Sequence, residues 1–262
     1  MKRRGLAFWL QLGFTLLVCA FLIVPVAMSM LAGVTVNYQT GIESGFTLRW
    51  LSQVWDGYRD TIFRSIGIAL ACLVCTLLLG VPAAYALARR GGRWARLVEE
   101  LLVMPVAVPG LATALALIVA YGFWGAFRTS WVFILVGHVL FTLPFMVRSV
   151  LAVMHAVDLK TLEESAASLG AGFGHRFLHV VLPNCRPGIV AGSLMVFTLS
   201  IGEFNMTWLL HTPLTKTLPV GLADAYASLR LEVGSAYTLC FFLMIVPLLI
   251  AIQRFGRTEG GR

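Results

Sequence analysis

The sequence has 262 residues, of which 59% are hydrophobic and 12% are charged, and it contains 25 glycines. A soluble domain averages roughly 45–50% apolar residues, and here the apolar residues form uninterrupted blocks. This excludes a soluble globular enzyme and a disordered chain, and it indicates an integral membrane protein. A net charge of +8 would suggest a nucleic-acid partner in a soluble protein. In a membrane protein, the positive charge is better explained by the topology of the chain. No nucleic-acid partner is therefore expected.

The first apolar segment is expected to cross the lipid bilayer. It runs from Ala7 to about Ala32, which is longer than the roughly 7–15 apolar residues of a cleaved signal peptide and suits a membrane span. The five cysteines are expected to be free thiols. Cys72 and Cys75 form a CxxC pattern inside an apolar run, but no second pair follows at zinc-ligand spacing.

Six apolar segments of roughly 20 residues predict six transmembrane helices, and the fold class is therefore all-α. They cover residues 8–32, 65–88, 101–121, 131–154, 188–210 and 235–253. Fourteen Lys and Arg residues then fall on the side of both termini, and six fall on the other side. Because cytoplasmic loops carry the excess of basic residues, we expect both termini to be cytoplasmic. Residues 33–64 and 211–234 form the larger outside loops, and residues 155–187 form the longest inside loop.

The inside loop contains a pattern that predicts a short, slim helix. Thr161 and Glu164 have the spacing of a capping box, in which each side chain bonds the other residue's backbone amide. Small residues follow, from Ser165 to Ser168. Gly170 stands where a helix end needs a positive φ. Such a helix would bury little by itself, but it could fit into a groove on another protein.

This loop resembles the signature of the permease subunits of binding-protein-dependent ABC importers, the MetI-like family. That signature is E-A-A, three residues, G, nine residues, and I-x-L-P. In this sequence the matching positions are Glu164, Ser165, Ala166, Gly170, Val180, Leu182 and Pro183. Every spacing is kept, and the departures are Ser165 for alanine and Val180 for isoleucine. The resemblance covers about residues 64–257. It predicts a first helix and outside loop over residues 1–64, the transporter core over 65–257 and a cytoplasmic tail over 258–262.

The resemblance implies that the loop docks onto a separate cytoplasmic ATPase. The residues expected at this contact are Thr161, Glu163, Glu164, Ser165, Ala166, Leu169, Gly170, Ala171, Leu182 and Pro183. A P-loop needs a lysine after a glycine, and none of the three lysines follows one. The chain is therefore expected to be non-catalytic, with no cofactor and no metal. The implied partners are two ABC ATPase subunits, a second and homologous permease subunit, a periplasmic solute-binding protein and the lipid bilayer of the inner membrane.

Glu203 lies well inside the fifth apolar segment, where a charge costs at least about 2.5 kcal/mol. On a continuous helix Ser200, Glu203 and Thr207 fall on one stripe, which we expect to face the translocation pathway or its gate. The alternative, a neutral or paired carboxyl group that holds helices together, stays open. His138 is expected to be a packed or hydrogen-bonded core residue. His175 and His179 have i, i+4 spacing but no third ligand nearby, so a solvated helix face is favoured over a metal site.

Within the family, the phrases LEESAASLGA and LPNCRPGIVAG look most like permeases of the polyamine type, whose relatives also carry ferric iron, aminoethylphosphonate or thiamine. The resemblance therefore ranks polyamine or phosphonate import above sugar import. One rival is an ion-coupled secondary transporter in which Glu203 would bind the proton or sodium ion. Another is a polytopic membrane enzyme, which would need a convergent catalytic or metal cluster that the sequence does not offer.

Overall fold

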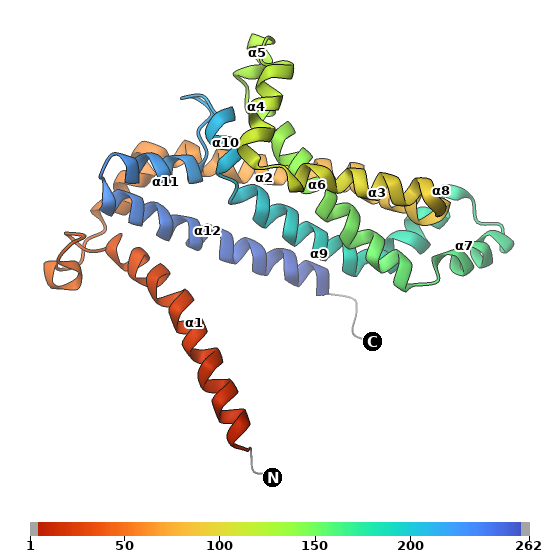
Figure 1. Ribbon diagram of the computed structural model, residues 1–262, viewed down its shortest axis with the longest axis horizontal. Coiled ribbons are helices and arrows are strands. Elements are labelled where there is room, and N and C mark those ends of the chain that lie inside the picture. Colours follow the sequence, from red (N-terminus) through yellow and green to blue (C-terminus); the bar gives the residue numbers. More distant parts are fainter. Residues whose placement is uncertain (1–4, 258–262) are drawn as a thin grey trace. The chain divides into compact units, whose positions relative to one another are not determined.

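The computed structural model describes residues 5–257, and the predicted tail at 258–262 lies outside this range. The described residues form helices joined by loops, with one isolated β-bridge between Thr35 and Phe46. Figure 1 shows the course of these helices. The expected all-α fold is confirmed.

Five helical segments are long and apolar enough to cross a membrane. Four of them are α1 (Leu6–Ala32), α2 (Arg49–Arg90), α6 (Trp131–Ala156) and α12 (Leu231–Arg257). The fifth is built from three consecutive pieces, α8 (Phe173–Arg176), the π-helical η2 (Phe177–Val181) and α9 (Leu182–Ile201). Residues 173–187 of the predicted inside loop therefore belong to a candidate membrane helix.

The predicted third span, residues 101–121, is not a continuous helix. It is divided between α3 (Gly92–Ala107) and α4 (Gly110–Tyr121), which meet at an angle of 101°. The break falls at Val108, which is extended with ψ 132°, because the ring of the following Pro109 disfavours helical backbone in the preceding residue. Counted as one broken span, this pair brings the number of candidate spans in the described chain to six.

The outside loops are also shorter than predicted. Residues 49–64, assigned to a loop, form the first turns of α2, whose 42 residues correspond to roughly 63 Å of helix. This is about twice the thickness of a bilayer core, so α2 extends beyond it. The remaining short helices are η1 (Gly41–Ser44), α5 (Gly125–Arg128), α7 (Leu159–Ser168), α10 (Asn205–Leu210) and α11 (Leu218–Ala227).

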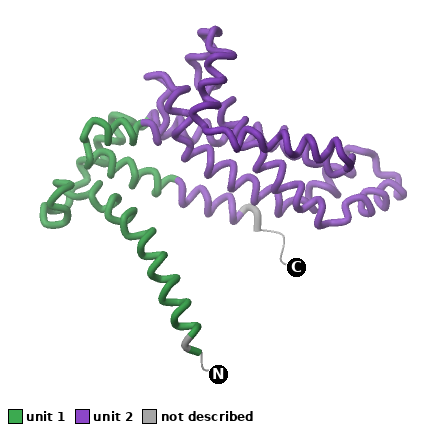
Figure 2. Tube along the Cα trace, in the orientation of Figure 1, with its two compact units in different colours: residues 1–59, 221–244 green, residues 60–220, 245–262 purple. Residues whose placement is uncertain are grey.

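The chain forms two compact units, shown in different colours in Figure 2. The first unit combines residues 1–59 with residues 221–244. Its buried centre includes Tyr237, and an added Cβ on Gly33 would lie 2.6 Å from the backbone nitrogen of Ala236. Glycine at position 33 therefore allows the end of α1 to touch the backbone of α12. The indole nitrogen of Trp50 donates to the carbonyl oxygen of Thr35 at 2.8 Å.

The second unit contains residues 60–220 and 245–262. Its centre is the pair α6 and α9, which pack side by side (Figure 1). Two glycines of α9 allow this contact. A Cβ on Gly188 would lie 2.6 Å from the carbonyl oxygen of Ser149, and a Cβ on Gly192 would lie 2.8 Å from the sulfur of Met146. Small residues four apart let membrane helices approach at backbone distance. The packed helices α6 and α9 flank α7 in the sequence and support it.

Candidate functional site

Helix α7 begins two residues before the predicted capping box. The cap is Asp158, whose carboxylate accepts hydrogen bonds from the Thr161 amide at 3.3 Å and from the Thr161 hydroxyl at 2.6 Å. Thr161 is therefore inside the helix, and the prediction that it caps the helix with Glu164 is wrong. A short acidic side chain directly before the first helical residue reaches the free amides better. These hydrogen bonds from Thr161 hold the pKa of the Asp158 carboxyl below its usual value.

The end of α7 has the predicted glycine geometry. Gly170 has φ +86°, a value that residues with a Cβ avoid. The Gly170 amide donates to the carbonyl oxygen of Ala167 at 2.9 Å, and the Ala171 amide donates to that of Ala166 at 3.0 Å. These two bonds form a Schellman motif, which satisfies the last carbonyls of the helix. The positive φ expected at Gly170 is confirmed.

The outward side of α7 presents a charged group and an apolar group. The Glu164 side chain is 68% exposed and lies 3.8 Å from the Lys160 ammonium, a surface pair of little energetic value. Leu169 is 89% exposed. The hydroxyl of Ser165 bonds the carbonyl oxygen of Thr161 at 2.8 Å, so the small residues offer a slim surface. This side can accept a complementary groove.

Glu163 points the other way and is only 5% exposed. Its Oε1 atom accepts a 2.6 Å hydrogen bond from the hydroxyl of Tyr85, and Arg89 donates to the same hydroxyl at 3.0 Å. Of the residues expected to form the docking contact, Glu163 is thus buried inside the protein, and Leu182 packs against the apolar core. Sequence reasoning did not find Tyr85 or Arg89, because nothing in the pattern of α2 indicates which residue meets a loop almost 80 positions later.

Leu182 and Pro183 lie at the start of α9, and the preceding π-helical segment adapts to the proline. A proline has no backbone N–H and crowds the preceding turn, and a π-bulge relieves this within an otherwise continuous helix. The side chain of Asn184 donates to the carbonyl oxygen of Val180 at 2.7 Å. Pro183 therefore accounts for the π-helical turn at the end of η2. Pro183 itself is exposed.

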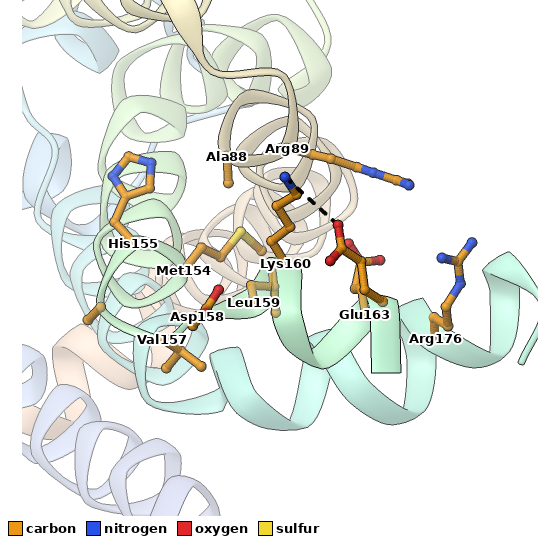
Figure 3. Close-up of a pocket in the computed structure, with 12 residues that line it drawn as sticks. Ala88, Arg89, Met154, His155, Val157, Asp158, Leu159, Lys160, Glu163 and Arg176 are labelled. Carbon is orange, nitrogen blue, oxygen red and sulfur yellow. Dashed lines mark ion pairs between the residues drawn. The ribbon is translucent and has the colours of Figure 1, made fainter. Parts of the chain in front are cut away.

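A cavity of about 600 Å³ lies beside α7, as the close-up in Figure 3 shows. Its walls come from the ends of α2 and α6 and from α7 and α8. Three basic and three acidic side chains line it, namely Arg89, Lys160, Arg176, Asp158, Glu163 and Glu164. Basic and acidic groups are balanced around it, so the cavity does not select for one sign of charge. It leaves one side of α7 without a packed neighbour.

A second candidate site lies where the predicted fifth span is broken. Helix α9 ends at Ile201, and α10 begins at Asn205. Glu203 lies between them, and its carboxylate accepts hydrogen bonds from the amides of Met206 and Thr207, both at 2.8 Å. The continuous helix over residues 188–210, from which the stripe was inferred, is therefore wrong. The carboxylate stabilises the free amides of the next helix, which permits the break.

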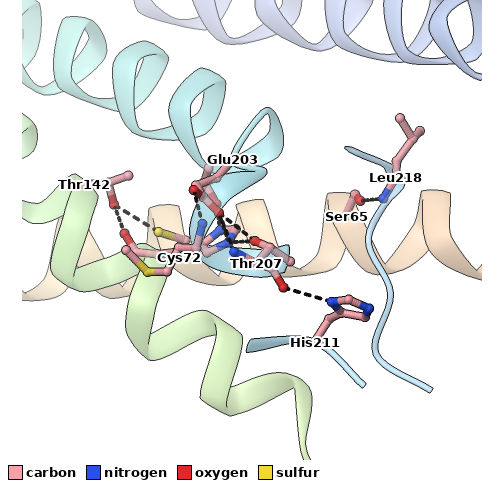
Figure 4. Close-up of polar contacts among 10 residues, drawn as sticks. Ser65, Cys72, Thr142, Glu203, Thr207, His211 and Leu218 are labelled. Atoms are coloured by element: carbon pink, nitrogen blue, oxygen red, sulfur yellow. Dashed lines mark hydrogen bonds and ion pairs between the residues drawn. The ribbon is translucent and has the colours of Figure 1, made fainter. Parts of the chain in front are cut away.

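Ser200, Glu203 and Thr207 nevertheless meet, and His138 joins them. Figure 4 labels Glu203 and Thr207 of this group. The Thr207 hydroxyl donates to Glu203 Oε2 at 2.7 Å, so its oxygen accepts from His138 Nε2 at 2.8 Å. If the imidazole is neutral, Nδ1 is then an acceptor and receives the hydroxyl of Ser200 at 2.8 Å. His138 is thus the hydrogen-bonded core residue that the sequence predicts. All four side chains are buried or nearly so within this chain, and their pathway role stays a prediction.

His175 and His179 stack on each other with ring centroids 4.2 Å apart. Among the described residues, no group of three or more His, Cys, Asp or Glu side chains is arranged to hold a metal ion. The five cysteines are free, and Cys72 lies 3.2 Å from the hydroxyl of Thr142 (Figure 4).

The family model described as "Binding-protein-dependent transport system inner membrane component" matches residues 76–258, well over half of the chain. The chain belongs to this family. It is therefore a multi-pass permease subunit of the ABC importer class, which in bacteria is located in the inner membrane. The resemblance read from the 164–183 motif is confirmed.

The chain is similar to permeases with different named solutes. It is 26% identical, over 94% of its length and 93% of the relative, to a Salmonella paratyphi A protein that carries the name of a 2-aminoethylphosphonate transport system permease, PhnV. It is 31% identical to the molybdenum transport system permease ModB of Mycobacterium bovis, over 81% of this chain and 84% of the relative. The two names differ in solute, so similarity alone does not fix the solute here.

Two solved structures share the fold. One is a bacterial ABC transporter involved in the import of the acidic polysaccharide alginate, with a TM-score of 0.72 over 97% of this chain and 96% of that chain, at 15% identity. The other is the inward-facing MetNI methionine ABC transporter, with a TM-score of 0.59 over 75% of this chain and 91% of that chain, at 16% identity. The MetI-like fold expected from the sequence is confirmed.

Proposed function

We propose that this permease subunit forms half of a translocation pathway and couples to a separate cytoplasmic ATPase through α7. The observation that carries the proposal is the geometry of α7, a slim ten-residue helix with Glu164 and Leu169 exposed and a Schellman end at Gly170. Such a helix can enter a groove on a partner and still be held on its other side by the permease. The permease carries out no chemistry of its own, and the partner hydrolyses ATP.

A second permease subunit completes the pathway. The candidate spans have large surfaces that this chain does not cover, since the buried share is 50% in α6 and 22% in α12. These surfaces are available to lipid and to a homologous subunit. Two ATPase subunits and a periplasmic solute-binding protein complete the assembly, as the family implies. The stretches rich in Lys and Arg support a cytoplasmic location for α7 and both termini.

The solute is a small polar compound, with 2-aminoethylphosphonate or a similar oxyanion as the first candidate class and a polyamine as the second. The named relatives favour the first class. The Glu203 carboxylate adds a physical argument, because three donors from Met206 and Thr207 already bond its two oxygens. That side chain is also only 8% exposed within this chain, so a polycation has little access to it.

The same geometry weighs against the ion-coupled alternative. A proton or sodium site at Glu203 would need carboxylate oxygens open to the pathway. Instead the side chain is 8% exposed and serves the amides at the start of α10. The role of Ser200, Glu203 and Thr207 at the pathway or its gate remains part of the proposal. Their network supports the break between α9 and α10, and a change in that break would change the pathway.

The proposal can be tested by photo-crosslinking in membranes. A photoreactive amino acid is placed at Leu169, on the exposed end of α7, and at Leu115, an exposed residue of α4 that serves as the matched control. The proposal predicts an adduct between this chain and the ATPase from position 169 and none from position 115. An adduct from neither position, with both variants inserted in the membrane, would disprove docking through α7.

A further inference from the structure

Helix α7 contacts the rest of the second unit through one narrow face. Among its ten residues, the buried ones are Leu159 and Glu163, which are four positions apart and therefore on the same side of the helix. Leu159 packs into the apolar cluster that also contains Val181 and Met154. Apolar packing has no preferred direction, so it permits α7 to tilt. Glu163 makes the directional attachment.

The attachment leads to the cytoplasmic end of α2. Tyr85 is 6% exposed and donates its hydroxyl to Glu163 at 2.6 Å, a length typical of a charge-assisted hydrogen bond. Arg89, one turn further along α2, is exposed and donates to the same hydroxyl oxygen at 3.0 Å. Donation to the hydroxyl oxygen polarises its O–H bond and strengthens the bond to the carboxylate.

The ring of Tyr85 also contacts the start of the fifth membrane helix. Its centroid lies 5.2 Å from that of Phe177 in an edge-on arrangement and 6.1 Å from that of Phe173. One side chain of α2 therefore touches both segments that follow α6, namely α7 through its hydroxyl and the α8–η2 segment through its ring. The cavity beside α7 is bordered by Arg89 and Glu163 (Figure 3), so the space next to this contact is not filled.

We propose that Glu163 is a positioning residue that, through the Tyr85 hydroxyl, fixes the direction of α7 on α2 and carries movements of α7 into the membrane helices. This inference rests on the proposed function, since the movement comes from a docked ATPase. Glu164 and Glu163 then have different tasks although they are neighbours. Glu164, which is 68% exposed, is available to the partner, whereas Glu163 is buried against Tyr85.

The chemistry of the contact predicts an order of effects. Tyr85→Phe removes the donor and leaves a buried carboxylate without it, which is the costly case. Glu163→Gln keeps an acceptor oxygen for Tyr85 but removes the charge, so its effect is smaller. Combining Tyr85→Phe with Glu163→Met removes both polar groups and the buried charge, and this double variant restores packing without restoring the directional bond.

The test uses the assembled complex of this permease, its partner permease and the ATPase, reconstituted in proteoliposomes with the binding protein of the same system. Three quantities are measured: ATPase recovery on purification, basal ATP hydrolysis, and the stimulation of hydrolysis by the binding protein. For Tyr85→Phe the stimulation is expected to fall about tenfold while ATPase recovery is unchanged. Glu163→Gln shows a smaller fall. Glu100→Gln, an exposed carboxylate of α3, is the control with unchanged stimulation.

The double variant keeps the test decisive if Tyr85→Phe assembles poorly. Restored assembly with stimulation still lost supports the positioning role. Restored assembly together with restored stimulation would show that the contact only supports packing, and it would overturn the inference. Wild-type stimulation in Tyr85→Phe would overturn it as well, and the proposed function would remain intact. A wild-type complex that contains no ATPase would instead refute the proposed function and, with it, this role.

Discussion

Two neighbouring carboxylates show how strongly the surroundings of a residue decide its task. Glu163 is buried against Tyr85, whereas Glu164 is exposed beside Lys160. The sequence places both on one short helix and cannot distinguish them. The direction of each side chain depends on where α7 begins, and Asp158 rather than Thr161 determines that.

Gly170 is the residue of α7 whose backbone conformation is most demanding. Gly170→Val places a β-branched side chain at φ +86°, at a cost of about 1–2 kcal/mol, and it distorts the Schellman end. Recovery of the ATPase with the purified permease should fall, while membrane insertion persists. Gly172→Val is the matched control, because Gly172 has φ −68° and an added Cβ meets no atom within 4 Å. Equal ATPase recovery from both variants would contradict the docking role of the helix end.

Glu203 lends itself to a conservative replacement. The two oxygens of Glu203 accept from two different amides, and glutamine offers only one oxygen, so Glu203→Gln leaves one buried amide unpaired at a cost of about 1–3 kcal/mol. We expect a less stable complex and a changed ratio of uptake to ATP hydrolysis. Thermal unfolding in detergent and uptake in proteoliposomes check this. Wild-type values in both assays would eliminate a role for Glu203 in the break and in the gate.

At the scale of helices, the long uninterrupted elements could be predicted from the sequence and the interruptions could not. The span over α6 was predicted as residues 131–154, close to its observed bounds, because its apolar residues are continuous. Pro109 accounts for the break at Val108, but prolines also lie inside the continuous helices α2, α6 and α12, so a proline alone does not predict a break. Helix α4 lies against α10 at Gly110, where an added Cβ would make an ordinary contact of 3.4 Å with the Cβ of Asn205. An apolar run does not reveal such a contact.

Asp158 should control how α7 begins. Asp158→Ala removes the side chain that accepts from Thr161, so the first turn loses its cap and ATPase recovery should decrease, whereas Asp158→Asn should retain the cap. The carboxyl pKa is lowered in the folded chain. The cap is therefore fully present above the ordinary carboxyl pKa of about 3.9 and is lost as the pH falls through the lower folded value. Wild-type ATPase recovery should thus be constant between about pH 5 and 8, and a decline within that range would contradict this account.

The packing of α6 on α9 should depend on glycine at the contact. Gly192→Leu forces a side chain against Met146, where even a Cβ would lie 2.8 Å from the sulfur, at a cost of about 1–3 kcal/mol. Gly67→Leu is the control, because a Cβ at that position of α2 meets nothing within 4 Å. Thermal unfolding followed by size-exclusion chromatography should show a lower midpoint for the Gly192 variant alone. Equal midpoints would mean that the α6–α9 contact does not require glycine.

For the whole molecule, the family and the membrane class follow from the sequence, because composition reveals the spans and the spacing from Glu164 to Pro183 reveals the motif. The division into two compact units could not be predicted from the sequence. Residues 221–244 join residues 1–59 through contacts such as Tyr58 with Tyr237, whose ring centroids are 5.4 Å apart. Contacts between segments more than 150 residues apart leave no periodic signal in a single sequence.

The central claim is that this permease imports its solute with energy from a partner ATPase. The most direct measurement is the accumulation of labelled 2-aminoethylphosphonate, molybdate and spermidine in proteoliposomes. They contain the complex captured through a tag on this chain, together with the solute-binding protein of the same system. We predict accumulation of at least one of these compounds only when ATP is supplied on the side of α7, and none when a proton or sodium gradient is supplied instead. Accumulation driven by either gradient, with no ATPase chain in the captured complex, would contradict the account.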